Sequence, residues 1–422
     1  MPDRDVFRAP IGTRDVLAPE SDRWQRLVAT FASHAARAGF GLLVTPMFEH
    51  VEVVQKLGGT TDVVRKELYD FDDKGGRRLA LRADGTASVV RAFVQHRPLL
   101  PWKVWYVAPN FRYERPQKGR YRQHWQVGVE VLGVDDPALD VEVIALADGF
   151  YRALGLERYR LAVNSMGDAA SRATYRDVLV RYWREHAALL GAEMERAEAN
   201  PLRILDSKRP DWAEMIAGAP QVGDHLTPDA RTRFEQVQAG LRALGIPFAV
   251  EPRLVRGLDY YTGVTFEFAS DALDAAQNAV GGGGRYDRLV QDMGGPPTPG
   301  IGFGIGIERV LIACDAEGVF AAPGTTLDVF LVDLVGGTEA VVLAEELRSA
   351  GFATDRSYGG RAMKKQLAAA DKSGAPFAVI LGPAELAAGS VTVKDLRRGE
   401  QAELPRAEVV AWMHARRDEA ST

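Results

Sequence analysis

The clearest alternation of polar and hydrophobic positions in the chain predicts a β-strand over residues 123–133. The two alternating sets are Gln126, Gly128 and Glu130 on one side and Val127, Val129 and Val131 on the other. Because successive side chains of a strand point to opposite faces, the valines would pack on a core. The polar face has no packing role, and we expect it to form the floor of a site for a small polar ligand.

The loop before this strand is strongly basic. Residues 103–109 predict a second strand, so the two strands and the loop would form an antiparallel hairpin. The cations of the loop are Arg112, Arg115, Lys118, Arg120 and Arg122. Guanidinium and ammonium groups make charge-assisted hydrogen bonds to phosphate oxygens, so we expect this loop to attract phosphates.

The spacing of apolar residues predicts a succession of helices and strands in the first part of the chain. Residues 20–39 have the spacing of an amphipathic helix, and a short strand that ends at Pro46 follows. Residues 79–84 predict another strand, after which Gly85 and Thr86 open a helix. Residues 170–246 are charged and helix-rich, which indicates a separate helical insertion over 169–247.

Strand-like alternation resumes at 248–268 and at 299–305, before a predicted helix over 306–317. Hairpin-linked strands favour a mainly antiparallel sheet with flanking helices. We therefore expect an α+β main domain, formed by residues 1–168 and 248–320 on either side of the helical insertion.

The end of the chain predicts a second domain, over residues 327–422. A shift in composition at 317–326 marks a linker. The elements expected after it are strand 327–333, helix 338–350, strand 352–356, helix 360–372, strand 376–381 and a final helix 406–417. Strands that alternate with helices indicate a small α/β domain with a parallel core.

Composition excludes several classes of function. The 422 residues carry a net charge of −5, so any nucleic-acid contact must use local basic patches. A single cysteine, Cys314, rules out an intrachain disulfide and a cysteine-based zinc site, and the dispersed histidines show no metal-binding spacing. The N-terminus lacks the apolar segment of a signal peptide, and no apolar run approaches about 18 residues. We expect a soluble, cytoplasmic protein without a membrane partner or a protein-bound metal.

Three arginines stand where a surface charge is not required. These residues are Arg112, Arg256 and Arg309. An arginine suits phosphate oxygens, and three together suggest a polyphosphate site. Structural ion pairing is the alternative for each one alone, because Glu114, Asp259 and Glu308 are close in sequence.

Glycines recur at period two in residues 300–306, which predicts a bare strand face against which an adenine ring could lie. The alternative is a strand that packs closely on a helix. No phosphate-binding GxxxxGK[ST] loop is present.

Two further segments carry polar aromatic side chains. The segment LVRGLDYYTG places Asp259, Tyr260 and Tyr261 in a turn, and the segment GGGGRYD ends near Tyr286. Glu130 and a tyrosine could together hold a small ring with two nitrogens. The alternatives are a hairpin with core tyrosines and a flexible glycine loop. No nucleophilic triad is suggested, so catalysis would depend on positioning and charge neutralisation.

Together these segments resemble those of histidyl-tRNA synthetases, a family of class II aminoacyl-tRNA synthetases, over nearly the whole chain. Residues 20–50 resemble class II motif 1, FRYERPQKGRYRQHWQVGVE resembles motif 2, and GIGFGIGIERVL resembles motif 3. LVRGLDYYTG and GGRYD resemble the two segments peculiar to the histidine enzymes, and they are the most specific of the set. The resemblance implies that the main domain is catalytic and that residues 327–422 bind the anticodon.

The resemblance also implies a role for individual residues. Asp84, Thr86 and Gln126 would hold the α-amino group of histidine, Glu130 and Tyr261 its imidazole, and Tyr260 and Tyr286 would line its pocket. Arg256 would lie between the histidine carboxylate and the ATP α-phosphate. Arg112 would contact the α-phosphate, Arg309 the β- and γ-phosphates, and Glu114 would belong to the ATP site. The family often has Glu where this chain has Asp84, which shortens the reach by one methylene.

The implied reaction has two steps. The histidine carboxylate attacks the ATP α-phosphorus, with Arg112, Arg256 and Mg²⁺ offsetting the repulsion of the two anions. The terminal ribose hydroxyl of tRNA(His) then attacks the carbonyl of histidyl-adenylate. Resemblance to motif 1 implies a homodimer. In the C-terminal domain, basic residues over 359–365 would bind phosphate at a helix start, the alternative being a solvated helix face.

Two other functions remain as alternatives. The first is a histidine-sensing regulatory paralogue that partners an ATP phosphoribosyltransferase and performs no chemistry. Such paralogues usually lose the motif arginines and the C-terminal domain, both of which this chain keeps. The second is a synthetase for proline, threonine or glycine, against which RGLDYYTG speaks.

Overall fold

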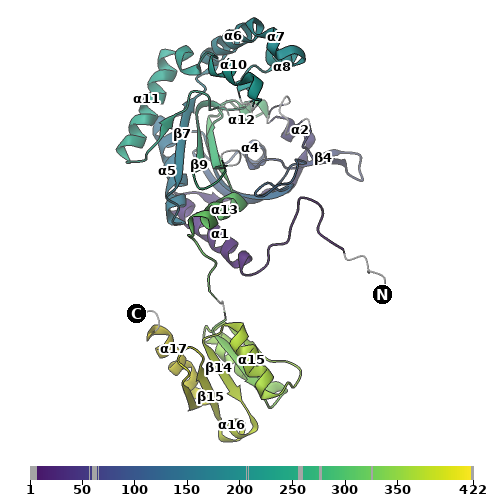
Figure 1. Ribbon diagram of the computed structural model, residues 1–422, viewed down its shortest axis with the longest axis vertical. Coiled ribbons are helices and arrows are strands. Elements are labelled where there is room, and N and C mark those ends of the chain that lie inside the picture. Colours follow the sequence, from purple (N-terminus) through teal and green to yellow (C-terminus); the bar gives the residue numbers. More distant parts are fainter. Residues whose placement is uncertain are drawn as a thin grey trace. The chain divides into compact units, whose positions relative to one another are not determined.

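The computed structural model of the chain describes residues 7–56, 58, 64, 66–205, 207, 209–254, 260–274, 278–324 and 327–419 (Figure 1). The chain forms two compact units, Met1–Ala321 and Ala322–Thr422. Within the described residues, no helix is both long and apolar enough to cross a membrane.

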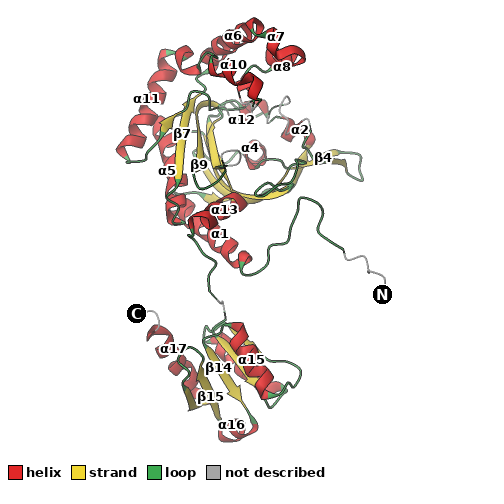
Figure 2. Cartoon of the chain, viewed as in Figure 1, coloured by secondary structure: helices red, strands yellow, loops and turns green. Residues whose placement is uncertain are grey.

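The first unit is built on an eight-stranded sheet with the order β1-β5-β6-β11-β10-β9-β7-β8. Figure 2 shows the strands in yellow. Its strands are β1 Gly41–Leu42, β5 Trp102–Phe111, β6 Gln123–Leu132, β7 Tyr159–Ser165, β8 Ala249–Val250, β9 Thr262–Ser270, β10 Ala279–Arg285 and β11 Gly300–Gly306. The strands from β5 to β7 in this order pair antiparallel, whereas β1 and β8 add parallel edges. The sheet confirms the expected α+β class.

One face of the sheet packs on helices to form the main core. These helices are α1 Glu20–Arg37, α5 Pro137–Ala153, α11 Pro228–Ala243 and α13 Ile307–Glu317. In α1 the residues Leu27, Phe31 and Ala35 recur every four positions and are buried, as an amphipathic helix requires. Val237 of α11 joins the same core. The predicted strand face of β6 meets this core, because Val127, Val129 and Val131 are buried in it.

Smaller elements surround the other side of the sheet. They are α2 Val51–Gln55, α4 Gly85–His96, α12 Leu289–Asp292 and a three-stranded sheet of β2 Phe48–His50, β4 Arg78–Leu81 and β3 Asp70–Asp72. Helix α4 lies within the curve of the large sheet (Figure 1). Its N-cap is Asp84, whose side chain accepts a hydrogen bond from the Thr86 N–H at 2.8 Å.

Short helices with a core of their own follow β7. They are α6 Ala169–Glu185, α7 Ala187–Leu190, α8 Met194–Ala199, α9 Leu202–Leu205 and α10 Ala213–Ala217, with 3-10 turns at Gly191–Glu193, Pro210–Trp212 and Val222–His225. Trp183 and Trp212 are buried in this separate cluster. Asp168 is the N-cap of α6 and Thr227 is the N-cap of α11. The two caps are in contact, with the Thr227 hydroxyl donating to the Asp168 carboxylate at 2.6 Å.

The second unit is a five-stranded sheet with the order β13-β12-β14-β15-β16. Its strands are β12 Val329–Asp333, β13 Thr354–Arg356, β14 Phe377–Leu381, β15 Ser390–Asp395 and β16 Gln401–Pro405; its helices are α14 Thr338–Ser349, α15 Met363–Ser373, α16 Pro383–Ala388 and α17 Val409–Glu419, with a 3-10 turn at Arg406–Glu408. β12 pairs parallel with β13 and β14, which confirms the parallel core. The β15–β16 hairpin is antiparallel.

Candidate active site

A cavity of about 470 Å³ lies over the polar face of β6 and collects most of the predicted site residues. The predicted residues that line it are Asp84, Thr86, Arg112, Glu114, Gln126, Tyr260, Tyr261, Tyr286 and Arg309. Glu130 lies in contact with two of them, Thr86 and Tyr286. Arg256 and Asp259 fall outside the described residues. The structure therefore brings together side chains from five separate stretches of sequence.

Glu130 is a fully buried carboxylate at the floor of this site. It accepts hydrogen bonds from the Thr86 hydroxyl at 2.6 Å and from the Tyr286 hydroxyl at 2.5 Å. Burial raises the pKa of Glu130 to about 8, while the two hydrogen bonds act to lower it and the charge of Asp84 raises it further. A buried acid held by two hydroxyls is suited to meet a polar, titratable group of a ligand.

Glycines on the neighbouring strand make room for these side chains. Gly302 pairs with Glu130 across β11 and β6, and a Cβ at position 302 would overlap the Glu130 carboxylate. A Cβ at Gly300 would overlap the ring of Tyr286. Only the far end of the strand is open, since a Cβ at Gly306 would meet no atom within 4 Å. On the predicted bare face, protein side chains therefore occupy the space at Gly300 and Gly302, and the space at Gly306 is open.

Tyrosine rings form one end of the cavity. Ring centroids lie 4.6 Å apart for Tyr260 and Tyr261 and 5.7 Å apart for Tyr260 and Tyr286. Burial raises the pKa of Tyr260 and of Tyr286 well above the usual value, so both remain protonated donors at neutral pH. This end can enclose a small ring between phenols and the Glu130 carboxylate.

Guanidinium groups form the other end. The Arg112 Nε donates to the Ala83 carbonyl at 3.0 Å, and the Arg309 Nη1 donates to the Ala279 carbonyl at 2.9 Å. Within the part of the chain that the structure describes, neither side chain forms an ion pair; Glu114 pairs instead with Arg120 at 3.3 Å. Burial lowers the pKa of Arg309, which indicates a cation that lacks full compensation. Such an end is suited to a polyanion.

The N-terminal segment supports the basic loop next to these arginines. The Arg122 N–H donates to the Gly12 carbonyl at 2.8 Å, and the Arg112 N–H donates to the Arg122 carbonyl at 2.9 Å. Gly12 has a φ of +84°, and a Cβ there would lie 2.6 Å from the Arg122 side chain. The close contact explains the glycine at position 12.

Sequence reasoning missed several residues that line the cavity. His124 lies two positions before Gln126 on the same strand face, so the period of two could have found it. Burial and the charges of Arg112 and Arg309 lower its pKa to about 3, so the ring is neutral. Tyr106 of β5 faces the cavity opposite Gly128. Arg203 reaches it from α9, for which the sequence offers no signal.

Comparison with known proteins agrees with this geometry. The family described as Histidyl-tRNA synthetase matches residues 12–310, and the family described as Anticodon binding domain matches residues 328–416. A protein of Rhodococcus erythropolis named Histidine--tRNA ligase is 48% identical over 412 residues, which are 96% of this chain and 97% of that protein. The similarity extends over nearly the full length of both proteins.

Solved structures give the same result. The crystal structure of apo Staphylococcus aureus histidyl-tRNA synthetase has a TM-score of 0.82 and 34% identity, covering 97% of this chain and 100% of that chain. An ATP phosphoribosyltransferase regulatory subunit/histidyl-tRNA synthetase from Bacillus halodurans has a TM-score of 0.63 and 23% identity, covering 84% of this chain and 93% of that chain, and it supports the fold alone. With a family match that spans both halves of the cavity, the chain belongs to the histidyl-tRNA synthetase family.

Proposed function

We propose that the protein is a histidine–tRNA ligase. It activates L-histidine with ATP to form histidyl-adenylate and pyrophosphate, and then transfers histidine to the 3′ end of tRNA(His). The observation that carries the proposal is a single cavity with a buried acid and tyrosines at one end and arginines at the other. Membership of the histidyl-tRNA synthetase family supports the same activity.

The tyrosine end would bind histidine. Glu130 would accept a hydrogen bond from the imidazole and Tyr261 would hold its other nitrogen, while Tyr260 and Tyr286 enclose the ring. A ligand without ring nitrogens would leave Glu130 buried without that partner, which costs about 1–3 kcal/mol or more for a charged group. Selectivity for histidine would follow from this cost.

The α-amino group of histidine would bind to Asp84, Thr86 and Gln126. Asp84 already caps α4 through one oxygen, so its other oxygen would take the ammonium. The Gln126 amide is oriented by Asn110, whose Nδ2 donates to the Gln126 Oε1 at 2.7 Å. Thr86 donates to Glu130, so it would link the ammonium and imidazole sites.

The arginine end would bind ATP. Arg112 would contact the α-phosphate and Arg309 the β- and γ-phosphates, and Arg256 would bridge the histidine carboxylate and the α-phosphate. The carboxylate and the phosphate are both anions, so neutralising their repulsion is a large part of lowering the barrier. The surroundings of Arg309 support this role, since it is partly buried beside Arg112 and Arg120 and forms no ion pair within the described residues.

A Mg²⁺ ion would accompany ATP. Such an ion usually takes one or two protein carboxylates together with the phosphate oxygens. Among the described residues no group of three acidic or metal-binding side chains could hold an ion alone, but Glu114 lines the cavity near the arginines. Glu114 would therefore hold Mg²⁺ on the nucleotide, and the ion would neutralise phosphate charge.

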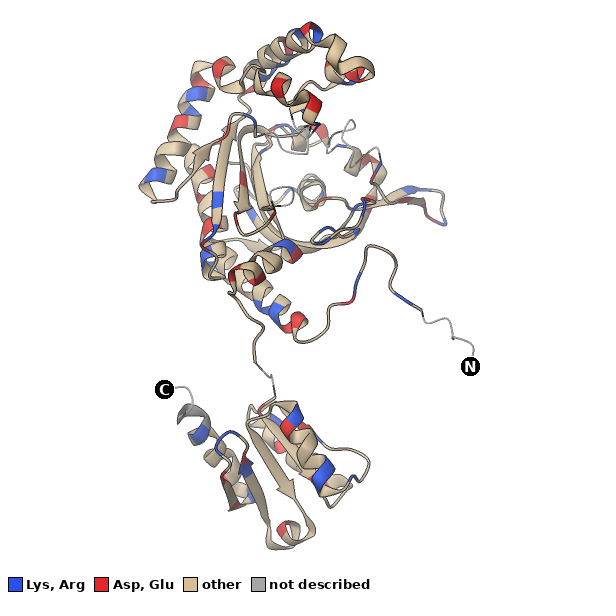
Figure 3. Ribbon diagram, viewed as in Figure 1, with Lys and Arg blue, Asp and Glu red and all other residues tan. Residues whose placement is uncertain are grey.

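The second unit would bind the anticodon of tRNA(His). Its α15 carries Lys364 and Lys365 at the N-terminal end, and Arg361 lies just before it; all three are exposed. Figure 3 colours the Lys and Arg positions of the chain blue. Cations at a helix start attract backbone phosphates. We assign residues 327–422 this role, residues 1–168 and 248–320 catalysis, and residues 169–247 to an insertion beside the active site. Because tRNA is charged where ribosomes work, we place the protein in the cytoplasm.

A homodimer would cover an apolar surface around β1, the edge strand of the large sheet. The exposed fractions there are 55% for Leu42, 82% for Val44, 53% for Met47 and 50% for Phe48. Exposed apolar side chains beside an unpaired strand edge are typical of an interface. Val44→Asp should yield monomers in sedimentation equilibrium, whereas Val341→Asp, at an exposed valine of α14, should leave the dimer intact. A wild-type monomer would contradict the proposal.

Amino-acid-dependent ATP–pyrophosphate exchange, measured with each of the twenty amino acids and without tRNA, tests the function. Exchange with histidine alone would support the activation step and its specificity. A protein that binds histidine but exchanges with no amino acid would instead be a regulatory paralogue. Arg256→Ala should abolish exchange while the circular dichroism spectrum stays unchanged; near-normal exchange would contradict the role of Arg256.

A further inference from the structure

We propose that Arg285 is a positioning residue that holds two walls of the histidine pocket in register from the opposite face of the sheet. The inference rests on the proposed function, because it concerns the pocket that would bind histidine. Arg285 itself does not line the cavity that contains Tyr286 and Asp84. It lines a second cavity, of about 200 Å³, between α11 and the start of β9.

The position of Arg285 follows from strand geometry. It is the last residue of β10, and Tyr286 follows it directly. Successive side chains point to opposite faces, so Tyr286 enters the first cavity and Arg285 the second. Any shift of the Arg285 backbone would therefore move Tyr286, whose hydroxyl donates to Glu130 at 2.5 Å.

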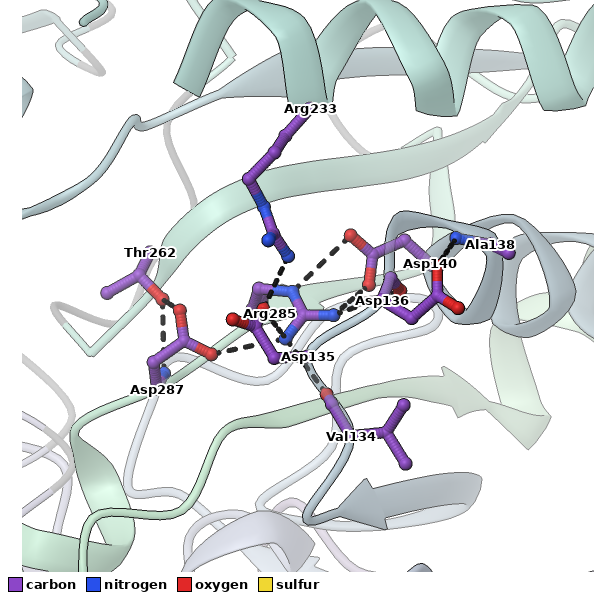
Figure 4. A network of polar contacts seen from close by, with 9 residues as sticks. All are labelled: Val134, Asp135, Asp136, Ala138, Asp140, Arg233, Thr262, Arg285 and Asp287. Carbon is purple, nitrogen blue, oxygen red and sulfur yellow. Dashed lines mark hydrogen bonds and ion pairs between the residues drawn. The ribbon is translucent and has the colours of Figure 1, made fainter. Parts of the chain in front are cut away.

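Arg285 is almost completely buried, and its guanidinium donates hydrogen bonds both to a near neighbour in the sequence and to groups about 150 residues away (Figure 4). Its Nη2 donates to the Asp140 Oδ1 at 2.6 Å and its Nε to the Asp140 Oδ2 at 3.3 Å. The Nη1 donates to the Val134 carbonyl at 3.2 Å and to the Asp287 Oδ1 at 3.3 Å. The guanidinium thus ties the end of β10 to the start of α5 and to the loop before it.

Asp287 connects Arg285 to a second wall of the pocket, the one formed by Tyr260 and Tyr261. The Thr262 hydroxyl donates to the Asp287 Oδ2 at 2.8 Å, and the Asp287 N–H donates to the Thr262 Oγ1 at 3.1 Å. Thr262 directly follows Tyr260 and Tyr261, which line the histidine pocket. One buried arginine is therefore connected both to Tyr286 and to the tyrosine pair.

A glycine contact strengthens this connection. Gly263 has a φ of +50°, and a Cβ there would lie 3.2 Å from the Arg285 Cδ. The Gly263 N–H donates to the Gly167 carbonyl at 2.9 Å, and the Met166 N–H donates to the Gly263 carbonyl at 2.6 Å. The start of β9 is thus held between the Arg285 side chain and the chain that leads into α6.

Helix α11 joins the same network from outside. The Arg233 Nη2 donates to the Asp135 Oδ1 at 2.5 Å, and the same oxygen lies 3.5 Å from the Arg285 Nη1 (Figure 4). Asp135 and Arg233 are more exposed than Asp140 and Arg285. The outer pair can therefore adjust while the inner pair keeps its geometry.

The chemistry of the site favours positioning over stability. Replacing a buried ion pair with apolar residues of similar volume is often neutral or stabilising, so an ion pair here needs another reason. A planar guanidinium fixes direction through several donors at once, which an ammonium cannot reproduce. An arginine at this position therefore fixes the direction in which the chain enters and leaves the pocket.

The test compares Arg285→Lys with Arg23→Lys. Arg23 is also buried, donates to Asp315 at 2.5 Å and to the Phe320 carbonyl at 2.7 Å, and lines neither cavity. In histidine-dependent pyrophosphate exchange, Arg285→Lys should raise the KM for histidine about 10-fold or more and change the KM for ATP less than about 2-fold. Arg23→Lys should leave the KM for histidine within about 2-fold of wild type. Asp287→Asn, a milder change, should act like Arg285→Lys with a smaller effect.

Several outcomes would overturn the proposal. It fails if the KM for histidine does not change in Arg285→Lys, or if both KM values rise together as general damage predicts. If Arg285→Lys does not fold, an unchanged KM for histidine in Asp287→Asn overturns it alone. If the wild-type protein shows no exchange, the proposed function fails instead, and the same variants are compared by equilibrium dialysis with radiolabelled histidine. Unaltered histidine affinity there would overturn the positioning role independently.

Discussion

Gly302→Ala should disable the histidine end of the active site while sparing the ATP end. Gly302 pairs with Glu130 across neighbouring strands, and the space above its Cα is occupied by the Glu130 carboxylate. The added Cβ would lie 2.5 Å from the Glu130 Cδ and would also overlap the Val129 carbonyl oxygen. Carbon atoms in contact are about 3.5–4.0 Å apart, so the carboxyl group must move by about 1 Å.

The magnitude follows from that displacement. A misplacement of about 1 Å in a catalytic or binding group can cost roughly 100-fold in rate. The movement is costly, because Glu130 is fully buried and its hydrogen bonds with Thr86 and Tyr286 would be distorted. We expect kcat/KM for histidine to fall about 100-fold, with the KM for ATP within about 3-fold of wild type. Overpacking should cost about 1–3 kcal/mol of stability.

Pyrophosphate exchange at varied histidine and ATP gives the kinetic result, and urea unfolding gives the free energy of unfolding. Gly306→Ala is the matched control for stability, because Gly306 lies on the same strand as Gly302 and a Cβ there would meet no atom within 4 Å. In a Glu130→Ala background, Gly302→Ala should cost at least about 1 kcal/mol less than in wild type, because the overlapping carboxylate is gone. Equal costs in both backgrounds would refute the steric argument, as would normal histidine kinetics in Gly302→Ala.

Other predictions concern Glu130 and the N-terminal segment. Glu130→Gln should raise the KM for histidine about 10- to 100-fold in pyrophosphate exchange through loss of the titratable acid that meets the imidazole, and equal effects on histidine and ATP would make Glu130 structural. Because the pKa of Glu130 is raised from 4.5 to about 8, its contribution to stability is complete below pH 4.5 and is lost as pH rises through 8. Urea unfolding should therefore show Glu130→Gln gaining about 2–3 kcal/mol on wild type between about pH 6 and 9, and parallel curves would argue against the raised pKa. Gly12→Ala should raise the KM for ATP several-fold by displacing Arg122, whereas Gly39→Ala, with a similar φ of +81° and open space around it, should leave that KM unchanged.

The elements that a simple period controls could be predicted from the sequence. The alternation over 123–133 predicted β6, the burial of its valines and the direction of Gln126 and Glu130, since only one register buries all three valines. The β-α-β-α-β order of the second unit was also predictable, although α15 begins at Met363 rather than at residue 360. Such patterns are local and repeat over several residues, so tertiary packing reinforces them.

Residues whose role depends on distant partners could not be predicted in the same way. Arg285 was visible in GGRYD, but its partners Val134 and Asp140 are about 150 residues away, and no local pattern links them. Asp84 was predicted as a ligand of an ammonium group. That its side chain also caps α4 could be recognised only from the structure, because the cap depends on the backbone conformation at the start of the helix. Arg203 lines the cavity although it belongs to the helical insertion. The sequence of its short helix α9 does not indicate that this helix lies beside the cavity.

The glycines of β11 show why a local pattern can identify a site and still leave its contents open. Alternating glycines indicate that space is needed above one strand face, but they do not indicate which group fills that space. In this protein Gly302 admits the carboxylate of Glu130 and Gly300 admits the ring of Tyr286, whereas the space at Gly306 stays open to the cavity. The same repeat thus serves protein side chains at one end and leaves room for a ligand at the other. Strand register decides between the two uses, because it sets Gly302 opposite Glu130 and Gly306 opposite Gln126.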